Sequence, residues 1–152
     1  MPIPRAAAVV VDGPRALLIK RYLRQPPGRL CVMCEAVALG PTCPGHSYAV
    51  LPGGHVEPGE TPETTALREL TEETTLTATI ARLLHTGTHN GRVATYYLMT
   101  NVTGTPVLSG PEAQAHSPND SYELLWADPA DFAALGLYPP DVVRPLTELL
   151  LG

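Results

Sequence analysis

The sequence contains no long apolar run. Its best early stretch, Ala6 to Val11, is too short to cross a membrane and stops at Asp12. It also shows no recognisable signal peptide. These absences argue against a membrane-spanning helix, so we expect a cytoplasmic protein without a membrane partner.

Basic residues are scarce as well. Ten lysines and arginines stand against fifteen aspartates and glutamates, which gives a formal net charge of −5. Six of the ten lie between Arg5 and Arg29, whereas six of the fifteen acids lie between Glu57 and Glu73. Binding a long nucleic acid would require a broad basic surface. The distribution therefore favours a small phosphorylated ligand, and we expect no long nucleic acid as partner.

The length and the hydrophobic content are typical of a single globular domain. The chain has 152 residues, of which 44% are hydrophobic, and we expect one domain over residues 1–152. Apolar runs at 6–11 and 16–22, separated by a turn at 12–14, predict a hairpin. Further strands are predicted at 48–51, 77–85, 91–102 and 121–127.

A helix is predicted to begin near residue 62, and it carries the most informative residues. Thr61 is placed as its N-cap, and a proline at the next position is tolerated in the first turn. On such a helix Glu69, Glu72 and Glu73 fall within an arc of roughly 100°, which we expect to face outward. Their mutual repulsion calls for a compensating cation, and oxygen ligands at this density suit Mg²⁺.

This stretch resembles the Nudix box of the Nudix hydrolases. The matching pattern is Gly54, five residues, Glu60, seven residues, and then the sequence RELTEETTL at 68–76. Only Thr75 departs from the pattern, because the family has there a glycine that ends the helix. A left-handed conformation at that position would cost a β-branched residue about 1 kcal/mol or more.

The resemblance implies a fold, a reaction and roles for the matching residues. The fold would be an α/β/α sandwich, with a mixed sheet between helices and the box as a loop-helix-loop. The reaction would be hydrolysis of a nucleoside diphosphate linked to another moiety, that is, an acid anhydride. The implied metal ligands for Mg²⁺ (or Mn²⁺) are Glu69, Glu72 and Glu73. Arg68 would orient these glutamates, and Glu60 would support the loop or assist at the metal.

The general base and the substrate contacts are open. Nudix families differ between a box glutamate, here Glu72, and a distal one, for which Glu112 in a long polar loop is the candidate. Gly53 and Gly54 lack side chains and would let backbone or ligand come close. The arginines that are candidates for phosphate or base contact are Arg21, Arg24 and Arg29.

Two other classes of function compete with an enzyme. The first is a non-catalytic module that senses or binds a nucleotide, although such Nudix-like domains usually lose box carboxylates. The second is an interaction protein that uses a cysteine-containing loop as its partner surface. An intact set of box carboxylates favours the enzyme over both.

All three cysteines lie in a segment rich in Pro and Gly, which we interpret as an insertion at 24–46. Cys31 and Cys34 are separated by two residues, and so are Cys43 and His46. Four such ligands could hold a structural zinc ion and order the loop. The alternative is that Cys31 and Cys34 pack in the core and that His46 belongs to the substrate pocket.

The C-terminal tail is predicted to form a proline-started helix between 139 and 150. Its leucines at 146, 149, 150 and 151 would either cover the sheet or meet a second subunit in a homodimer.

Overall fold

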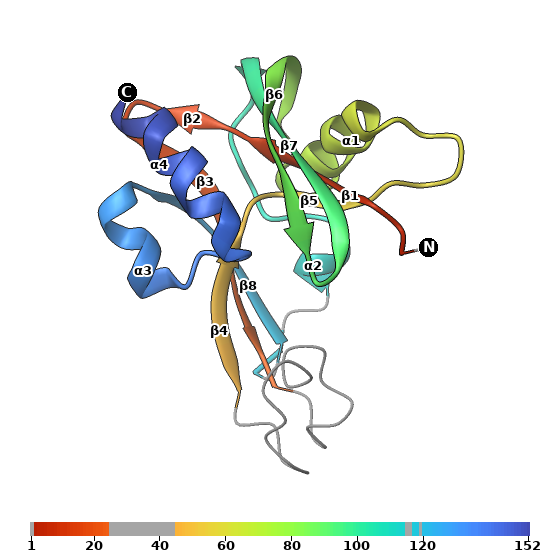
Figure 1. Cartoon of the computed structure of the whole chain (residues 1–152). Helices are drawn as coiled ribbons and strands as arrows, with labels where there is room; N and C mark the ends of the chain where they lie inside the picture. The colour runs from red at the N-terminus through yellow and green to blue at the C-terminus, as the bar shows by residue number, and fades with distance from the viewer. Residues whose placement is uncertain (1, 25–44, 115–116, 119) are drawn as a thin grey trace.

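The computed structural model describes residues 2–24, 45–114, 117–118 and 120–152. Most of the strands come first in the chain, and the C-terminal part is helical (Figure 1). The strands are β1 (Arg5–Val9), β2 (Val11–Asp12), β3 (Arg15–Leu23), β4 (His46–Val50), β5 (Gly53–His55), β6 (Thr77–His89), β7 (Arg92–Thr103) and β8 (Asp120–Ala127). The helices are α1 (Pro62–Thr74), α2 (Pro111–Gln114), α3 (Phe132–Leu135) and α4 (Val143–Leu151), with 3₁₀ turns η3 (Pro129–Asp131) and η4 (Pro140–Val142).

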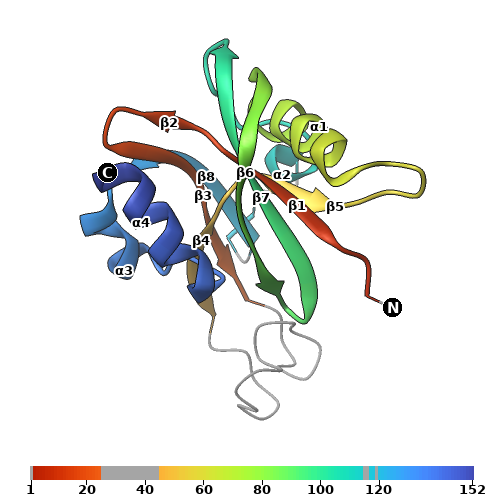
Figure 2. The ribbon, with the colours of Figure 1, turned by 45° about the horizontal axis from the view of Figure 1, so that its top comes forward.

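The strands form two sheets. One sheet has the order β5-β1-β7-β6, in which β1 and β7 run parallel and the other pairs run antiparallel. In the other sheet β3 pairs antiparallel with β2, β4 and β8. Helix α1 lies on one side of this β-layer and α3 and α4 lie on the opposite side (Figure 2). The arrangement is a mixed α/β sandwich of the expected kind.

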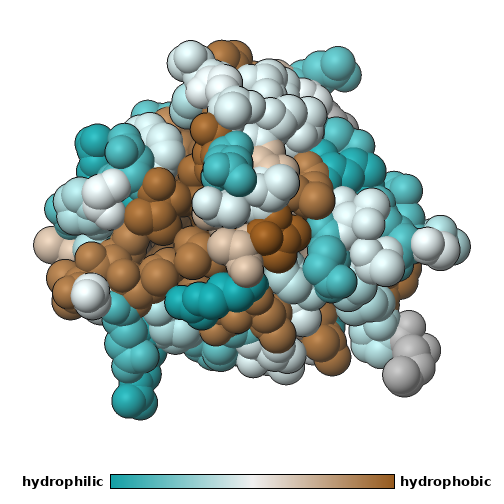
Figure 3. Space-filling model, turned by 90° about the horizontal axis from the view of Figure 1, so that it is seen from above, coloured by the Kyte–Doolittle hydropathy of each residue, from teal (hydrophilic) through white to brown (hydrophobic). Residues whose placement is uncertain are grey.

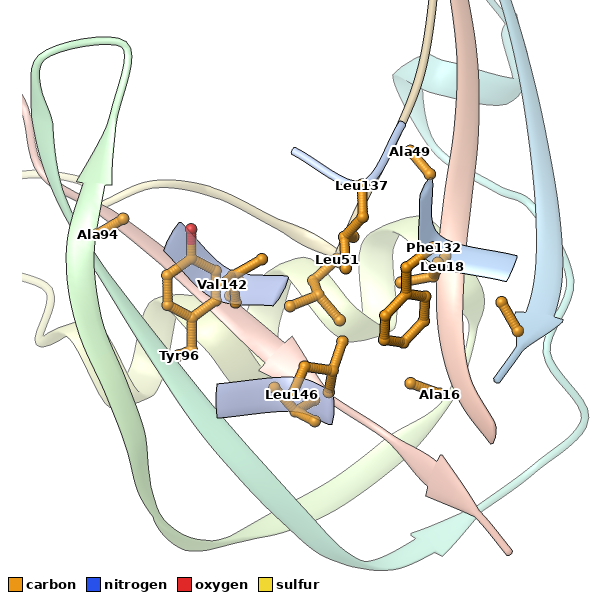
Figure 4. Packing of buried hydrophobic residues seen from close by; sticks show 13 residues of the cluster. Ala16, Leu18, Ala49, Leu51, Ala94, Tyr96, Phe132, Leu137, Val142 and Leu146 are labelled. Atoms are coloured by element: carbon orange, nitrogen blue, oxygen red, sulfur yellow. The ribbon is translucent and has the colours of Figure 1, made fainter. Parts of the chain in front are cut away.

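Strand β1 explains the continuous apolar run near the start of the chain. Its side chains alternate between two cores, so both faces of the strand are buried and neither needs polar residues. Ala7 and Val9 pack in the core that contains Phe132 and Leu146, part of which is seen in Figure 4. The even-numbered alanines of the strand pack in a second core with Leu70 of α1. Helix α1 is thereby fixed directly over β1.

The predicted hairpin at the start of the chain is largely wrong. Only the short strand β2 pairs with β3, with Val11 opposite Ala16 and Asp12 opposite Arg15. Strand β1 instead joins the other sheet, between β5 and β7. The apolar run therefore divides near Val10 and supplies one strand to each sheet.

The C-terminal helix α4 covers the sheet. Leu146 is fully buried in the core, whereas Leu151 at the end of the helix keeps 73% of its surface exposed. Apolar residues also gather on the surface at the left of Figure 3, the side on which α4 lies in Figure 1. Helix α4 therefore packs mainly on the sheet. The homodimer stays a prediction. No helix in the described ranges is long and apolar enough to span a membrane.

Candidate active site

The loop and helix that carry the box begin where the sequence predicts. Helix α1 starts at Pro62, and the Thr61 side chain accepts a hydrogen bond from the Thr64 N–H at 3.2 Å. This bond satisfies one of the N–H groups that the first helical turn leaves unpaired. Before the helix, the Glu60 N–H donates to the Glu57 carbonyl at 2.9 Å and closes a turn. The loop is therefore tied to the helix start by its own backbone.

Arg68 joins the loop to the acidic face of the helix. Its Nε and Nη2 atoms donate to the two carboxylate oxygens of Glu60 at 2.7 and 3.0 Å. Its Nη1 atom donates to Glu69 at 2.9 Å and to Glu72 at 3.2 Å. One guanidinium therefore offsets part of the repulsion among these carboxylates, as a bound cation would. Hydrogen bonds from Arg68 and Thr65 lower the pKa of Glu60 to about 2.

Glu73 differs from the expectation that the acids face outward. It is buried, with 5% of its surface exposed, and its Oε1 atom accepts the Gly53 N–H at 2.8 Å. A carboxylate is costly to bury unless it is hydrogen-bonded, and this contact supplies a partner. Glu73 thus ties the C-terminal part of α1 to strand β5.

The two glycines at the start of β5 leave room for close neighbours. A side chain on Gly54 would overlap the Glu69 carboxylate. A Cβ atom on Gly53 would lie 2.5 Å from the Ala6 carbonyl oxygen and 2.8 Å from the Ala7 Cα atom. Gly54 therefore gives room to an acidic side chain, and Gly53 gives room to the backbone of β1.

These elements surround a cavity of about 300 Å³. Several predicted residues meet in it: Gly53, Gly54, Glu69, Glu73 and Arg21. Its remaining described lining residues are Arg5, Ile19, Val50, His55, Glu57 and Tyr122. The other box residues lie outside this lining. Glu60 and Arg68 pair beside it, and 46% of the Glu72 side chain is exposed.

Arg21 is held firmly on the cavity wall. Its guanidinium lies 4.5 Å from the centre of the Tyr122 ring and 5.6 Å from that of the Tyr48 ring. Its Nη2 atom also donates to the Tyr122 hydroxyl at 2.8 Å and to Asp120 at 3.4 Å. Arg21 comes from β3, and side chains of β4 and β8 thus fix its guanidinium.

Arg5 and His55 also line the cavity, although neither was predicted from the sequence. They lie opposite each other in the pairing of β1 with β5. Burial lowers the pKa of Arg5, while Glu73, Tyr96 and Glu69 act in the opposite direction. One signal for Arg5 was available, because it is a charged residue at the start of a strand that is otherwise apolar and buried.

Glu69 and Glu73 form an acidic wall of the cavity, and their carboxylate oxygens suit a hard divalent cation. Glu69 and Glu73 line the cavity and offer carboxylate oxygens, the ligands that Mg²⁺ and Mn²⁺ prefer. Within the described ranges, no group of three or more His, Cys, Asp and Glu side chains is arranged to hold a metal ion. Arg68 instead holds the Glu69 and Glu72 carboxylates.

The distal candidate base, Glu112, lies in α2. The segment before α2 is bound to the end of α1, because the Ser109 N–H donates to the Glu73 carbonyl at 2.8 Å and the Val107 N–H to the Thr74 carbonyl at 2.9 Å. Helix α1 ends at Thr75, which has a left-handed backbone with φ 66°. The chain thus carries α2 to the box helix.

The predicted zinc site lies mostly outside the described residues. Cys31, Cys34 and Cys43 all fall there, as does Arg29. His46 is the first residue of β4 and pairs with Leu23 of β3. The zinc site stays a prediction.

Comparison with known proteins identifies the class of this chain. The family model of the NUDIX domain matches residues 1–146, so the chain belongs to the NUDIX domain family. The resemblance seen in the sequence is confirmed, and the protein is a Nudix-type hydrolase. No curated protein matches the chain significantly.

Solved structures agree with this class. A MutT NUDIX hydrolase from Burkholderia pseudomallei is 27% identical, with a TM-score of 0.61 and 97% of each chain covered. The ORF135 protein of E. coli is 23% identical, with a TM-score of 0.56, and 98% of this chain and 88% of that one are covered. A NUDIX hydrolase from Nitrosomonas europaea is 18% identical, with a TM-score of 0.65, and 99% of this chain and 70% of that one are covered. The last two likenesses concern the fold alone.

Proposed function

We propose that this protein is a cytoplasmic, metal-dependent hydrolase that cleaves the diphosphate of a nucleoside diphosphate linked to another moiety. The observation that carries the proposal is one cavity with two kinds of wall. Glu69 and Glu73 line it on the side of α1, and Arg5 and Arg21 line it from β1 and β3. Carboxylates suit a hard cation, and guanidinium groups suit phosphate oxygens.

The reaction needs positive charge at the phosphates and a base for the attacking water. The negative oxygens of a diphosphate repel a nucleophile, and a bound Mg²⁺ or Mn²⁺ ion supplies charge that offsets this repulsion. We assign Glu69, Glu72 and Glu73 as the residues that hold it. Arg68 and Glu60 orient these carboxylates through their paired hydrogen bonds.

The proton of the attacking water passes to a carboxylate. We propose Glu72 or Glu112 for this role, because either can serve as a general base once the water is close to it. Arg68 donates to the Glu72 carboxylate at 3.2 Å and so fixes its position on the box helix. The Glu112→Gln variant separates the two candidates, because it abolishes the single-turnover rate with metal binding retained only if Glu112 is the base.

The direct test is release of phosphate from a panel of nucleoside diphosphates, nucleoside triphosphates and nucleotide sugars, coupled with pyrophosphatase or phosphatase. With Mg²⁺ we expect turnover on at least one member and none after chelation. Glu73→Gln keeps an acceptor for the Gly53 N–H but removes the charge, so turnover should fall by about 10²- to 10⁴-fold with the fold intact. Glu123→Gln, on the exposed side of β8, is the matched control and should keep full activity.

Two outcomes would contradict the proposal. Turnover that survives in Glu73→Gln would place the chemistry elsewhere. No turnover on any member, together with tight nucleotide binding by calorimetry, would favour the non-catalytic nucleotide-sensing module instead. Metal analysis of the purified protein and of Cys34→Ser tests the separate prediction of structural zinc.

A further inference from the structure

Arg5 stands apart from the other arginines of the site. Arg68 donates to three glutamates, and Arg21 is held by two tyrosine rings and by Asp120. The guanidinium of Arg5 makes no hydrogen bond or ion pair with any described residue. A guanidinium carries five N–H donors in a fixed planar fork, and this one lines a cavity while donating to none of the described residues.

Charged groups of both signs lie around Arg5, and burial lowers its pKa. The pKa of His55 is lowered first by burial and then by the charge of Arg5. Arg92 is a neighbouring positive charge and, like burial, lowers the pKa of Arg5. Glu73 and Glu69 act in the opposite direction, but neither forms an ion pair with it. A partly buried cation in such a place gains most from an anionic partner that enters the cavity.

Arg5 lines two cavities, and their volumes indicate which of them can hold an anionic partner. Arg5 also lines a second cavity, together with His89, Tyr96 and Tyr138, but its volume is only about 10 Å³. A space of that size holds one water molecule at most. The cavity of about 300 Å³, which Arg5 shares with Glu69 and Glu73, has room for a phosphate group.

We propose that Arg5, on the cavity wall formed by β1, binds a phosphate of the substrate. Its guanidinium fork would donate to non-bridging oxygens of that phosphate. The inference rests on the proposed function and adds to it a substrate-binding residue. Arg5 contributes the phosphate contact, and Arg21 contributes a fixed, stacked cation on another wall. The net charge of −5 makes a local cation valuable, because an anionic substrate must enter an acidic site.

The test measures binding of inorganic pyrophosphate by calorimetry, which does not depend on turnover. Arg5→Gln should weaken this affinity by about 10- to 100-fold, the range for losing a charge-assisted hydrogen bond. Arg5→Lys keeps the charge but loses the fork, so its affinity should lie between those of the wild type and Arg5→Gln. The matched control is Arg82→Gln, which removes an equal charge from an exposed position on β6.

A second measurement separates anion binding from an effect on the carboxylates. The affinity of the free protein for Mn²⁺ should be unchanged or higher in Arg5→Gln, because a positive charge near Glu69 and Glu73 is removed. In steady-state kinetics the variant should raise KM more than it lowers kcat. Circular dichroism and thermal unfolding of Arg5→Gln and Arg5→Lys verify that both are folded.

Each result decides the inference separately from the proposed function. Pyrophosphate affinity in Arg5→Gln within twofold of the Arg82→Gln control overturns the role of Arg5, even if Glu73-dependent hydrolysis is found. Weaker Mn²⁺ binding in Arg5→Gln also overturns it, because Arg5 would then act through the metal ligands. Loss of pyrophosphate affinity in a protein that hydrolyses no substrate would support Arg5 as the anion-binding residue and reject the hydrolase proposal.

Discussion

The acidic and basic walls of the cavity differ in how their charges are satisfied within the protein. On the acidic wall, Glu69 is held by Arg68 and Glu73 by the Gly53 N–H. On the basic wall, Arg21 is engaged in a similar way, but the Arg5 guanidinium has no hydrogen bond or ion pair with a described residue. The acidic wall is therefore organised by the protein itself, whereas part of the basic wall depends on a ligand.

This difference separates two tasks. If the acidic wall holds a metal ion, as proposed, its ligands must be fixed in advance, and Arg68 already holds the Glu69 and Glu72 carboxylates. A phosphate contact can instead form when the substrate arrives, because a guanidinium fork is rigid and needs little further ordering. Changes on the acidic wall should therefore affect structure and chemistry together, whereas changes on the basic wall should mainly affect binding.

The largest expected effect comes from the two glycines at the start of β5. Gly53→Ala should lower the free energy of unfolding by about 3 kcal/mol, because its Cβ would meet the backbone of β1. Gly54→Ala should leave the fold largely intact, because its Cβ would meet the end of the Glu69 side chain, which can move. Turnover should then fall by about 10²-fold through the displaced carboxylate.

Urea unfolding and turnover, measured on both glycine variants, test this contrast. Equal loss of stability in the two variants would show that Glu69 cannot move, and equal activity in Gly54→Ala and the wild type would show that its position is unimportant.

The next effect concerns Glu60, which pairs with Arg68 behind the acidic wall. The pKa of Glu60 in the folded protein is about 2, below its ordinary value of 4.5. The unfolded chain therefore takes up the proton first as the pH falls. The contribution of this group is present above about pH 4.5 and is lost as the pH falls towards 2.

Glu60→Gln should flatten the pH dependence of stability in that window. Urea midpoints between pH 2 and 6 measure it, with Glu123→Gln as the control at an exposed, unrelated acid. If the wild-type and Glu60→Gln profiles have the same slope, the pairing of Glu60 with Arg68 does not contribute to stability.

The acidic and basic walls also differ in how far they could be predicted from the sequence. The box helix and its N-cap at Thr61 follow from local spacing, since each depends on residues within about four positions, whereas a helix end at residue 75 was implied only by the family resemblance. Arg21 was named as a candidate from the sequence, but its place on one wall with Arg5 could not be found this way. Arg5, Arg21 and Tyr122 come from three strands, and only strand pairing brings them to one cavity.

Two expectations failed for related reasons. The first apolar run was predicted to form a hairpin, but burial on both faces reflects a strand between two cores and does not identify its partner. Glu73 was expected to face outward with the other acids. Its hydrogen bond to the Gly53 N–H, from a strand twenty residues earlier, allows it to be buried instead.

A smaller effect is expected at Thr75, which ends the box helix. Its φ of 66° is unfavourable for a β-branched residue, although its hydroxyl donates to the Thr105 carbonyl at 3.1 Å. Thr75→Gly should raise the free energy of unfolding by about 1 kcal/mol, because the strain relieved outweighs that exposed hydrogen bond. Turnover should not change, since Thr75 does not line the cavity.

Urea denaturation measures the effect, and Thr75→Ala is its control, because alanine loses the hydrogen bond while keeping most of the strain. Greater stability in Thr75→Ala than in Thr75→Gly would rule out relief of strain as the cause.

The smallest effect returns to the basic wall. Burial lowers the pKa of His89 to about 4, and the charge of Arg5 is the next cause. His55 and Arg21 lower it further, and Asp141 acts in the opposite direction. If the charge of Arg5 is uncompensated, Arg5→Gln should move the pKa of His89 upward while leaving it below its ordinary value, because burial remains.

NMR titration of the His89 ring protons measures this shift, with Arg82→Gln as the control. The same titration in the presence of pyrophosphate should raise the pKa of His89 in the wild type, because a bound anion offsets the charge of Arg5. It should have little effect in Arg5→Gln, where that anion binds weakly. If the pKa of His89 is equal in the wild type and in Arg5→Gln without a ligand, the charge of Arg5 is already balanced within the protein, and the two walls of the cavity do not differ in the way proposed.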